Sequence, residues 1–229
     1  MTPPYTPSCL PNWPAVDDAT QMRFDENREL LEGCDDITLS EILIQQPFET
    51  LYNECARLSR QQIESVADAI FDRFVRARPA AACLYASWRL NRRQIAYLFV
   101  EHPWDIIIHA PSLLNAKQLR QCVIRYPDMA LQFAAKYLQS TDFVRLCISL
   151  GASFIEEPLL ENAYRLEPKH FVRLLRNPST RVALANIVTD EQLVQRETVA
   201  SLLLEACRSL TESELDEAAP VLRAIASEI

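Results

Sequence analysis

Two of the three histidines lie in a setting that can support chemistry. Asp105 lies between His102 and His109, Glu101 precedes them, and Cys122 follows on the next predicted helix. A cysteine, a histidine and a carboxylate together can form an activated nucleophile. An enzyme with such a Cys/His site is therefore one alternative. Cys122 also falls among the apolar positions of a helix, so we favour a buried structural role for it and assign no catalytic residue.

Metal and cofactor sites are not predicted. The sequence has no histidine pair at i, i+4 and no H-E-x-x-H motif, which are common zinc-binding patterns. Its seven cysteines are scattered and include no C-x-x-C pair. An odd number without such a pair indicates neither a disulfide framework nor a zinc knuckle. We predict no metal, no cofactor and free cysteines in a reducing compartment.

Charge is distributed unevenly along the chain, whose formal net charge is −8. Residues 1–36 hold eight acids and two bases, and residues 210–229 hold five acids and one base. Residues 57–125 carry the opposite balance, with eleven bases against five acids. The chain therefore has acidic ends and a basic segment in its first half, which indicates an acidic partner for that segment.

Four bases in this segment come just after predicted helix starts: Arg60, Arg92, Arg93 and Lys117. Positive charge at a helix N-terminus opposes the helix dipole and costs about 0.3 kcal/mol or more, so helix stability does not explain it. Stacked repeats bring equivalent positions into register. We predict that these four residues form a basic ridge that binds a partner protein; an ordinary solvated face is the alternative. The acidic N-terminal segment is a candidate competitor for the same ridge.

The elements that would position these residues are short helices with recurring start signals. An apolar residue, a Ser, Thr or Asn, two variable residues, a Glu or Gln and a second apolar residue form a capping box with its hydrophobic staple. Six copies predict helix starts, namely Ile37-TLSE-Ile42, Leu58-SRQQ-Ile63, Leu90-NRRQ-Ile95, Leu114-NAKQ-Leu119, Val188-TDEQ-Leu193 and Leu210-TESE-Leu215. Two degenerate copies, Leu138-QSTD-Phe143 and Leu166-EPKH-Phe171, keep the apolar spacing.

Prolines repeat with the same period. Pro79, Pro103 and Pro127 are 24 residues apart, and Pro47 and Pro178 open similar apolar stretches. Proline is favoured in the first turn of a helix, where its missing N–H is not needed. Each unit therefore reads as a helix A that starts at the proline, a tight turn and a helix B that starts at the capping box. Helices of about ten residues are unstable alone, so each must pack on its neighbours.

The 24-residue unit, seen for example in PDMALQFAAKYLQSTDFVRLCISL, resembles the leucine-rich repeat variant and related bacterial helical repeats, which are similar in architecture to HEAT and armadillo arrays. The resemblance covers roughly residues 37 to 215 and implies a fold but no activity. The iron–sulfur cluster found beside some repeats of that kind needs a cysteine cluster that this chain lacks. We expect an all-α fold, a right-handed α-solenoid of about seven short helix-pair repeats.

Two domains are expected: a flexible proline-rich, acidic N-terminal arm at residues 1–36 and a helical repeat domain at residues 37–229. Neither a signal peptide nor a membrane span is expected, so we predict a cytoplasmic protein, either in the producing cell or in a host cell after secretion. The oligomeric state is not predicted.

Three function classes fit this organisation. The leading one is a non-enzymatic protein-binding scaffold or adaptor, such as a secreted bacterial effector, an inhibitor or an immunity protein, because solenoids expose long binding surfaces. The second is an RNA-binding helical repeat protein, against which the pI near 5.0 argues. The third is the enzyme with the Cys/His site described above.

Overall fold

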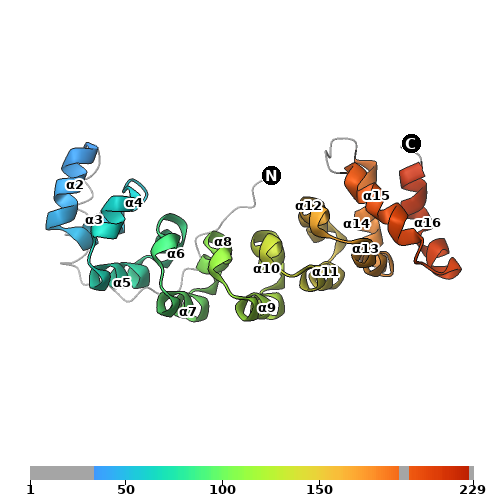
Figure 1. Cartoon of the computed structure of the whole chain (residues 1–229), viewed down its shortest axis with the longest axis horizontal. Coiled ribbons are helices and arrows are strands. Elements are labelled where there is room, and N and C mark those ends of the chain that lie inside the picture. Colours follow the sequence, from blue (N-terminus) through green and yellow to red (C-terminus); the bar gives the residue numbers. More distant parts are fainter. Residues whose placement is uncertain (1–33, 191–195, 227–229) are drawn as a thin grey trace. The chain divides into compact units, whose positions relative to one another are not determined.

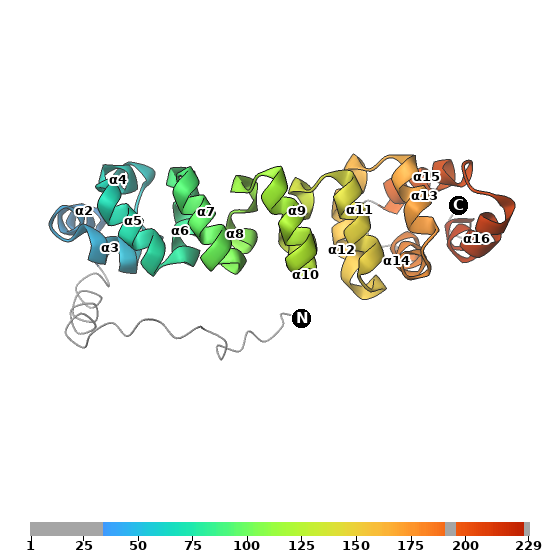
Figure 2. The same ribbon diagram turned by 90° about the horizontal axis from the view of Figure 1, so that it is seen from below.

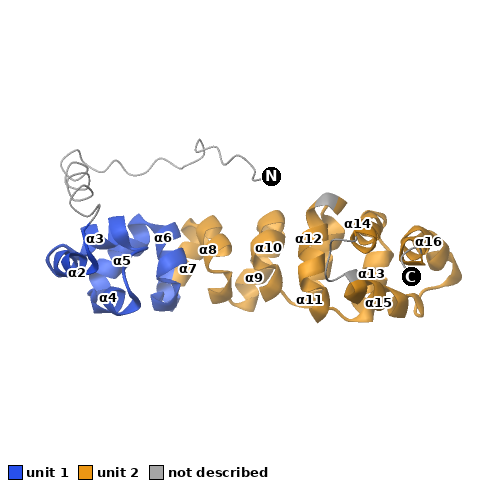
Figure 3. Cartoon of the chain, turned by 90° about the horizontal axis from the view of Figure 1, so that it is seen from above, with its two compact units in different colours: residues 1–94 blue, residues 95–229 orange. Residues whose placement is uncertain are grey.

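The computed structural model describes residues 34–190 and 196–226, and within these ranges every regular element is helical. The predicted all-α class is therefore confirmed for this part of the chain. The chain divides into two compact units, residues 1–94 and residues 95–229, which are described separately (Figure 3). Most of the predicted arm, residues 1–33, lies outside the described residues.

The described part of unit 1 contains five helices and a short 3-10 turn (Figure 1), namely α2 (Asp36–Gln45), α3 (Pro47–Glu54), α4 (Arg60–Ser65), α5 (Asp68–Ala77), α6 (Pro79–Tyr85) and η2 (Ser87–Arg89). Helix α7 (Arg92–Glu101) crosses the boundary between the units. Unit 2 continues with α8 (Pro103–His109), η3 (Pro111–Leu113), α9 (Ala116–Arg125), α10 (Pro127–Ala134), η4 (Ala135–Tyr137), α11 (Ser140–Ser149), α12 (Ala152–Asn162), η5 (Ala163–Arg165), α13 (Pro168–Leu175), α14 (Pro178–Thr189), α15 (Arg196–Cys207) and α16 (Glu212–Ala226).

The predicted proline starts are confirmed. Pro47, Pro79, Pro103, Pro127 and Pro178 each occupy the first turn of a helix. In the middle of the chain the pattern repeats every 24 residues: α6, α8 and α10 are each followed by a 3-10 turn and then by the ten-residue helices α7, α9 and α11.

One buried leucine links each 3-10 turn to the next helix. Leu90, Leu114, Leu138 and Leu166 are extended, with φ from −63° to −90° and ψ from 123° to 150°. Each is at most 8% exposed. The extended leucine reverses the direction of the chain and at the same time buries an apolar side chain beside the start of the following helix.

Four of the six full capping boxes are confirmed by hydrogen bonds. They join Ser59 with Gln62, Asn91 with Gln94, Asn115 with Gln118 and Thr211 with Glu214. In each box the backbone N–H of the last residue donates to the first side chain, and the first backbone N–H donates to the last side chain. The two degenerate boxes precede α11 and α13 as predicted, and at α13 the Glu167 N–H donates to His170 Nδ1 at 3.0 Å.

Two box predictions need correction. Thr38 does not cap a helix: α2 starts at Asp36, and Asp35 Oδ1 accepts from the Thr38 N–H at 2.8 Å because a carboxylate is the stronger cap at a helix N-terminus. Thr189 lies in the last turn of α14, where its hydroxyl donates to the carbonyl oxygens of Ala185 and Asn186. The last three residues of that predicted box, 191–193, lie outside the described residues.

The Ser59 box starts a helix, but not the predicted helix B. Helix α4 ends after six residues, and Val66 then takes the extended conformation seen at the linking leucines. Helix α5 starts two residues later, 24 residues before α7. The Leu58-to-Leu90 interval of 32 residues thus contains an eight-residue insertion, which replaces a 3-10 turn with the longer α4.

From α8 to α12, helices A lie in one row and helices B in another (Figure 1). Helix α10 packs on α8, α12 on α14, and α14 on α16, while α13 packs on both α11 and α15. Viewed from below, the axes of α10, α11 and α12 run roughly perpendicular to the direction in which these helices stack (Figure 2). The core between the rows includes Ile107, Leu131 and Phe143, each at most 2% exposed. No helix among the described residues meets the length and apolarity that a membrane span needs.

Replacing Leu114 with alanine tests the linking leucine. Leu114 is 6% exposed, so Leu114→Ala should lower the free energy of unfolding by about 2–5 kcal/mol through lost burial and an unfilled cavity. Ile124→Ala is the control: this side chain is 78% exposed, and its loss should cost under about 0.5 kcal/mol. Urea unfolding followed by circular dichroism measures both, and equal costs would contradict the assigned register.

Candidate protein-binding surfaces

An arginine in the 3-10 turn of unit 1 ties that turn to the preceding repeat. Arg89 donates to the carbonyl oxygens of Ile63 and Val66, the latter at 2.5 Å. Its guanidinium also lies over the Phe71 ring, 4.3 Å from the centroid, and pairs with the exposed Asp68 at 3.0 Å. The Arg89 side chain is only 12% exposed, so its charge loses most of its hydration. The hydrogen bonds to the two carbonyl oxygens compensate for that loss.

Unit 2 repeats the same arrangement at η5. Arg165 donates to the carbonyl oxygens of Ala135 and Leu138, both at 2.5 Å, and its guanidinium lies 4.9 Å from the centroid of Phe143. The two arginines contact equivalent positions, since Ile63 and Ala135 each lie three residues before the extended residue of the preceding repeat. Burial lowers the pKa of Arg165 below its usual value. We call this arrangement the arginine clamp.

The clamp occurs where the staple residue of the preceding repeat is aromatic. Phe71 and Phe143 offer ring faces to Arg89 and Arg165. In the two repeats between them, the equivalent staple residues are Ile95 and Leu119, and Leu113 and Tyr137 stand in place of the arginine. Sequence analysis missed this pairing, although the shared tripeptides Trp-Arg-Leu and Tyr-Arg-Leu before the helix B starts were a readable signal.

Each clamp holds an exposed aromatic residue directly before the arginine. In unit 1 this residue is Trp88, which is 38% exposed, and in unit 2 it is Tyr164, which is 71% exposed. Fixing the neighbouring arginine to backbone carbonyls restricts the turn, so the aromatic side chain is presented from a defined position. A rigid exposed aromatic side chain loses little conformational entropy when a partner covers it.

Trp88 lies beneath a second arginine. The guanidinium of Arg60, the first residue of α4, lies 4.6 Å from the centroid of the Trp88 ring. An ion pair of 3.0 Å between Arg60 Nε and Glu64 Oε1 orients that guanidinium. In the last turn of α6, Leu84 and Tyr85 are 50% and 43% exposed. The cation–π contact contributes about 0.5–1 kcal/mol at such an exposed site.

Two further arginines follow Trp88 in the first turn of α7. Arg92 and Arg93 are exposed, and neither side chain forms an ion pair with a residue in the described part of the chain. The sequence from residue 73 to residue 100 contains six arginines and no acid. We define the Trp88 surface as Arg60, Leu84, Tyr85, Trp88, Arg92 and Arg93. It combines exposed apolar groups with the positive charge of Arg92 and Arg93, which form no ion pair in the described part of the chain, and of Arg60, which pairs with Glu64.

The structure places the members of the predicted basic ridge on different elements. Arg60 starts the inserted α4 and is not equivalent to Arg92, because α5 is the helix B of that repeat. Arg93 and Lys117 are equivalent, each being the second residue of a ten-residue helix B. Lys117 belongs to unit 2 and is exposed. The register argument is therefore wrong for Arg60, while Trp88 is a member of the surface that sequence analysis missed.

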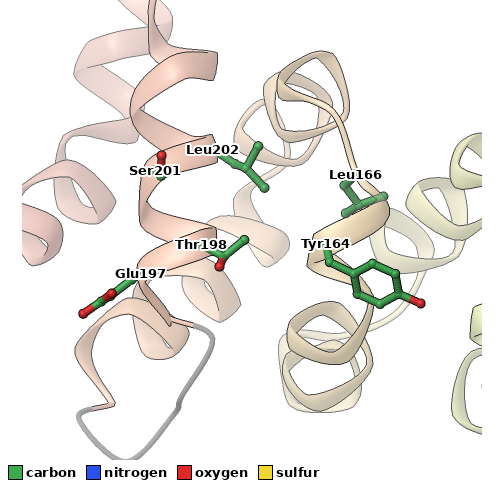
Figure 4. A pocket seen from close by; sticks show the side chains of 6 residues that line it. All are labelled: Tyr164, Leu166, Glu197, Thr198, Ser201 and Leu202. Carbon is green, nitrogen blue, oxygen red and sulfur yellow. The ribbon is translucent and has the colours of Figure 1, made fainter.

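The exposed aromatic residue of unit 2 borders a shallow pocket of about 430 Å³. Tyr164 and Leu166 line one side, and Glu197, Thr198, Ser201 and Leu202 of α15 line the other (Figure 4). The walls alternate apolar and hydroxyl groups and include a single carboxylate. Such an open, mixed lining suits a short peptide segment better than an enclosed small molecule.

Within the described ranges, the polar contacts of His102 are with a tyrosine and an aspartate rather than with Cys122. His102 contacts Tyr97, whose hydroxyl lies 3.3 Å from Nε2, and Asp105, whose Oδ2 lies 3.8 Å from Nδ1. Among the described residues, no hydrogen bond joins Cys122 to His102 or His109. Burial raises the pKa of the Cys122 thiol to about 11, so almost none of it is the nucleophilic thiolate at neutral pH.

Asp105 is the one carboxyl near these histidines with a raised pKa. Burial raises it above the ordinary value, and the neighbouring His102 and His109 oppose that shift. The contacts of His102 with Tyr97 and with Asp105 hold the turn between α7 and α8 in place. We therefore assign these three side chains a structural role.

Two further cysteines are buried like Cys122. Cys55 and Cys147 are buried and free, and burial raises the pKa of Cys55 to about 11 and that of Cys147 to about 12. No group of histidine, cysteine and acidic side chains in the described ranges is arranged to hold a metal ion.

No protein-family model, curated protein or solved structure matches the chain. The resemblance to leucine-rich repeat variant and HEAT-like repeats therefore stays a prediction, based on the 24-residue unit.

Replacing either clamp arginine with lysine should destabilise its unit. An ammonium group cannot donate to two carbonyls and lie flat on a ring at once, so Arg89→Lys and Arg165→Lys should each lower the free energy of unfolding by about 1–3 kcal/mol. Arg125→Lys, at an exposed position of α9, is the matched control and should change it by under about 0.5 kcal/mol. Urea unfolding measures all three, and a clamp variant as stable as the control would show that the clamp contributes nothing.

Proposed function

We propose that the chain is a non-enzymatic scaffold or adaptor that binds a partner protein with an acidic surface. The single observation that carries this is the Trp88 surface, where a clamped, exposed tryptophan lies beneath Arg60 and next to two arginines without described acidic partners. Tryptophan, tyrosine and arginine are the residue types that dominate binding energy at protein interfaces.

The helical architecture supports the same function. We propose that the repeats stack into a right-handed α-solenoid of about seven helix pairs, with the two rows of helices from α8 to α12 as its local form. Such arrays offer extended surfaces rather than enclosed catalytic pockets. The pocket beside Tyr164 supplies a second contact for the partner in unit 2.

An effector, inhibitor or immunity protein that acts in a reducing cytoplasm is the biological setting we propose. Its support is the set of free, buried cysteines with raised thiol pKa values, which need no oxidising compartment for stability.

RNA binding is the competing function that the six arginines between residues 73 and 100 favour. Arginine and aromatic side chains together also bind single strands. The net charge of −8 opposes it, because phosphate binding gains from a positive field around the whole molecule.

Reversing the charge of the Trp88 surface tests the proposal. In the full chain, Arg60→Glu, Arg92→Glu and Arg93→Glu together should abolish co-purification of a specific protein from lysate of the producing cell, because repulsion replaces attraction to acidic side chains. The control carries the same charge change at exposed positions of unit 2: Arg125→Glu, Arg173→Glu and Arg208→Glu.

The expected result is a protein partner retained by wild type and control and lost from the Trp88-surface variant. Partners shared equally by all three proteins would overturn the assignment of this surface. Retention of RNA that nuclease treatment releases, with loss in the same variant, would favour the competing function.

A further inference from the structure

The first described residue of unit 1, Cys34, contacts Arg57, which lies three residues before the Trp88-surface residue Arg60. Arg57 Nη2 donates to the carbonyl oxygen of Cys34 at 2.6 Å, and its Nη1 pairs with Glu54 at 3.2 Å. Arg57 precedes Arg60 by three residues, a separation of at most about 10 Å along an extended chain. With the length of the Arg57 side chain added, the point where residues 1–33 join the described part of the chain lies within about 20 Å of the start of α4.

The segment that ends at this point carries the charge that the surface lacks. Residues 17–33 contain six acids, Asp17, Asp18, Asp25, Glu26, Glu29 and Glu32, against two arginines. These residues lie outside the described ranges, so the inference uses only their composition and their distance along the chain. From Cys34, five residues span about 17 Å and nine residues about 30 Å, so with their side chains Asp25, Glu26 and Glu29 can reach Arg60 and its neighbours.

We propose that residues 17–33 bind the Trp88 surface in the same molecule and that an acidic partner must displace them. This inference rests on the proposed function, since it gives that surface a built-in competitor. Covalent attachment a few residues from the surface supplies a local concentration of about millimolar, so weak exposed contacts suffice. The partner must then match the same chemistry, an acidic segment with apolar groups that cover Trp88.

Trp88 itself reports whether the segment is bound. The chain has three tryptophans, and Trp13→Phe with Trp104→Phe leaves Trp88 as the sole fluorophore. In this background of the full chain, we compare the native acids with a variant whose six acids between residues 17 and 33 are changed to Asn or Gln. The measurement is acrylamide quenching of Trp88 fluorescence at low salt, with no partner present.

Trp88 should be quenched about two-fold more strongly in the neutralised variant than with the native acids, and about 0.5 M salt should remove the difference. Arg92→Glu with Arg93→Glu should raise quenching to the same level, because neither residue covers the indole in the structure. The control neutralises six exposed acids elsewhere, namely Glu101, Asp128, Glu161, Glu205, Glu212 and Asp216, and should leave quenching unchanged.

Equal quenching of the native and neutralised chains at low salt would overturn the inference. So would an equal rise in the control, which would trace the effect to net charge alone. Because the experiment contains no partner, either outcome leaves the co-purification test of the proposed function to be decided separately.

Discussion

Helices of six to twelve residues cannot hold their own shape in water, and this constraint governs most of the described structure. Each helix must bury one face against its neighbours, and each turn must deliver the next helix at a fixed place. The extended leucines meet the second need, since Leu90, Leu114, Leu138 and Leu166 place a buried side chain between a 3-10 turn and a new helix. Where the core leaves a phenylalanine ring beside the turn, the arginine clamp adds a second tie through backbone carbonyls. The exposed aromatic residues that we assign to binding, Trp88 and Tyr164, directly precede the clamp arginines, so the clamps also fix their positions.

Much of the helical pattern could be predicted from the sequence because its signals are local. A proline in the first turn and a reciprocal capping box act through residues within one helical turn, so Pro103 and the Asn115–Gln118 pair predict helix starts without knowledge of the fold. The two predictions that were wrong, at Ser59 and at Thr38, also have physical reasons. Ser59 has a good box, but its helix ends after six residues because the chain must still form the extended Val66 before α5. At α2, the carboxylate of Asp35 outcompetes the Thr38 hydroxyl.

The candidate site was harder to predict, because its contacts join residues far apart in the sequence. The contact of Arg60 with Trp88 spans 28 residues, and that of Arg165 with Leu138 spans 27. Charge counting found Arg60, Arg92, Arg93 and Lys117 but gave no reason to select Trp88 or to separate Lys117 from the other three. The enzyme alternative with a Cys/His site stays a prediction, against which the burial of Cys122 and the raised pKa of its thiol argue.

The central claim is that a partner protein covers Trp88, and photo-crosslinking tests it most directly. A benzophenone amino acid placed at position 88 of the full chain in the producing cell should crosslink to one specific protein. The same group at position 154 is the comparison, because Phe154 is also exposed, at 64%, but lies outside the Trp88 surface. A crosslink from position 88 and none from position 154 is the predicted result. No crosslink from position 88, or equal crosslinking from both positions, would contradict the account.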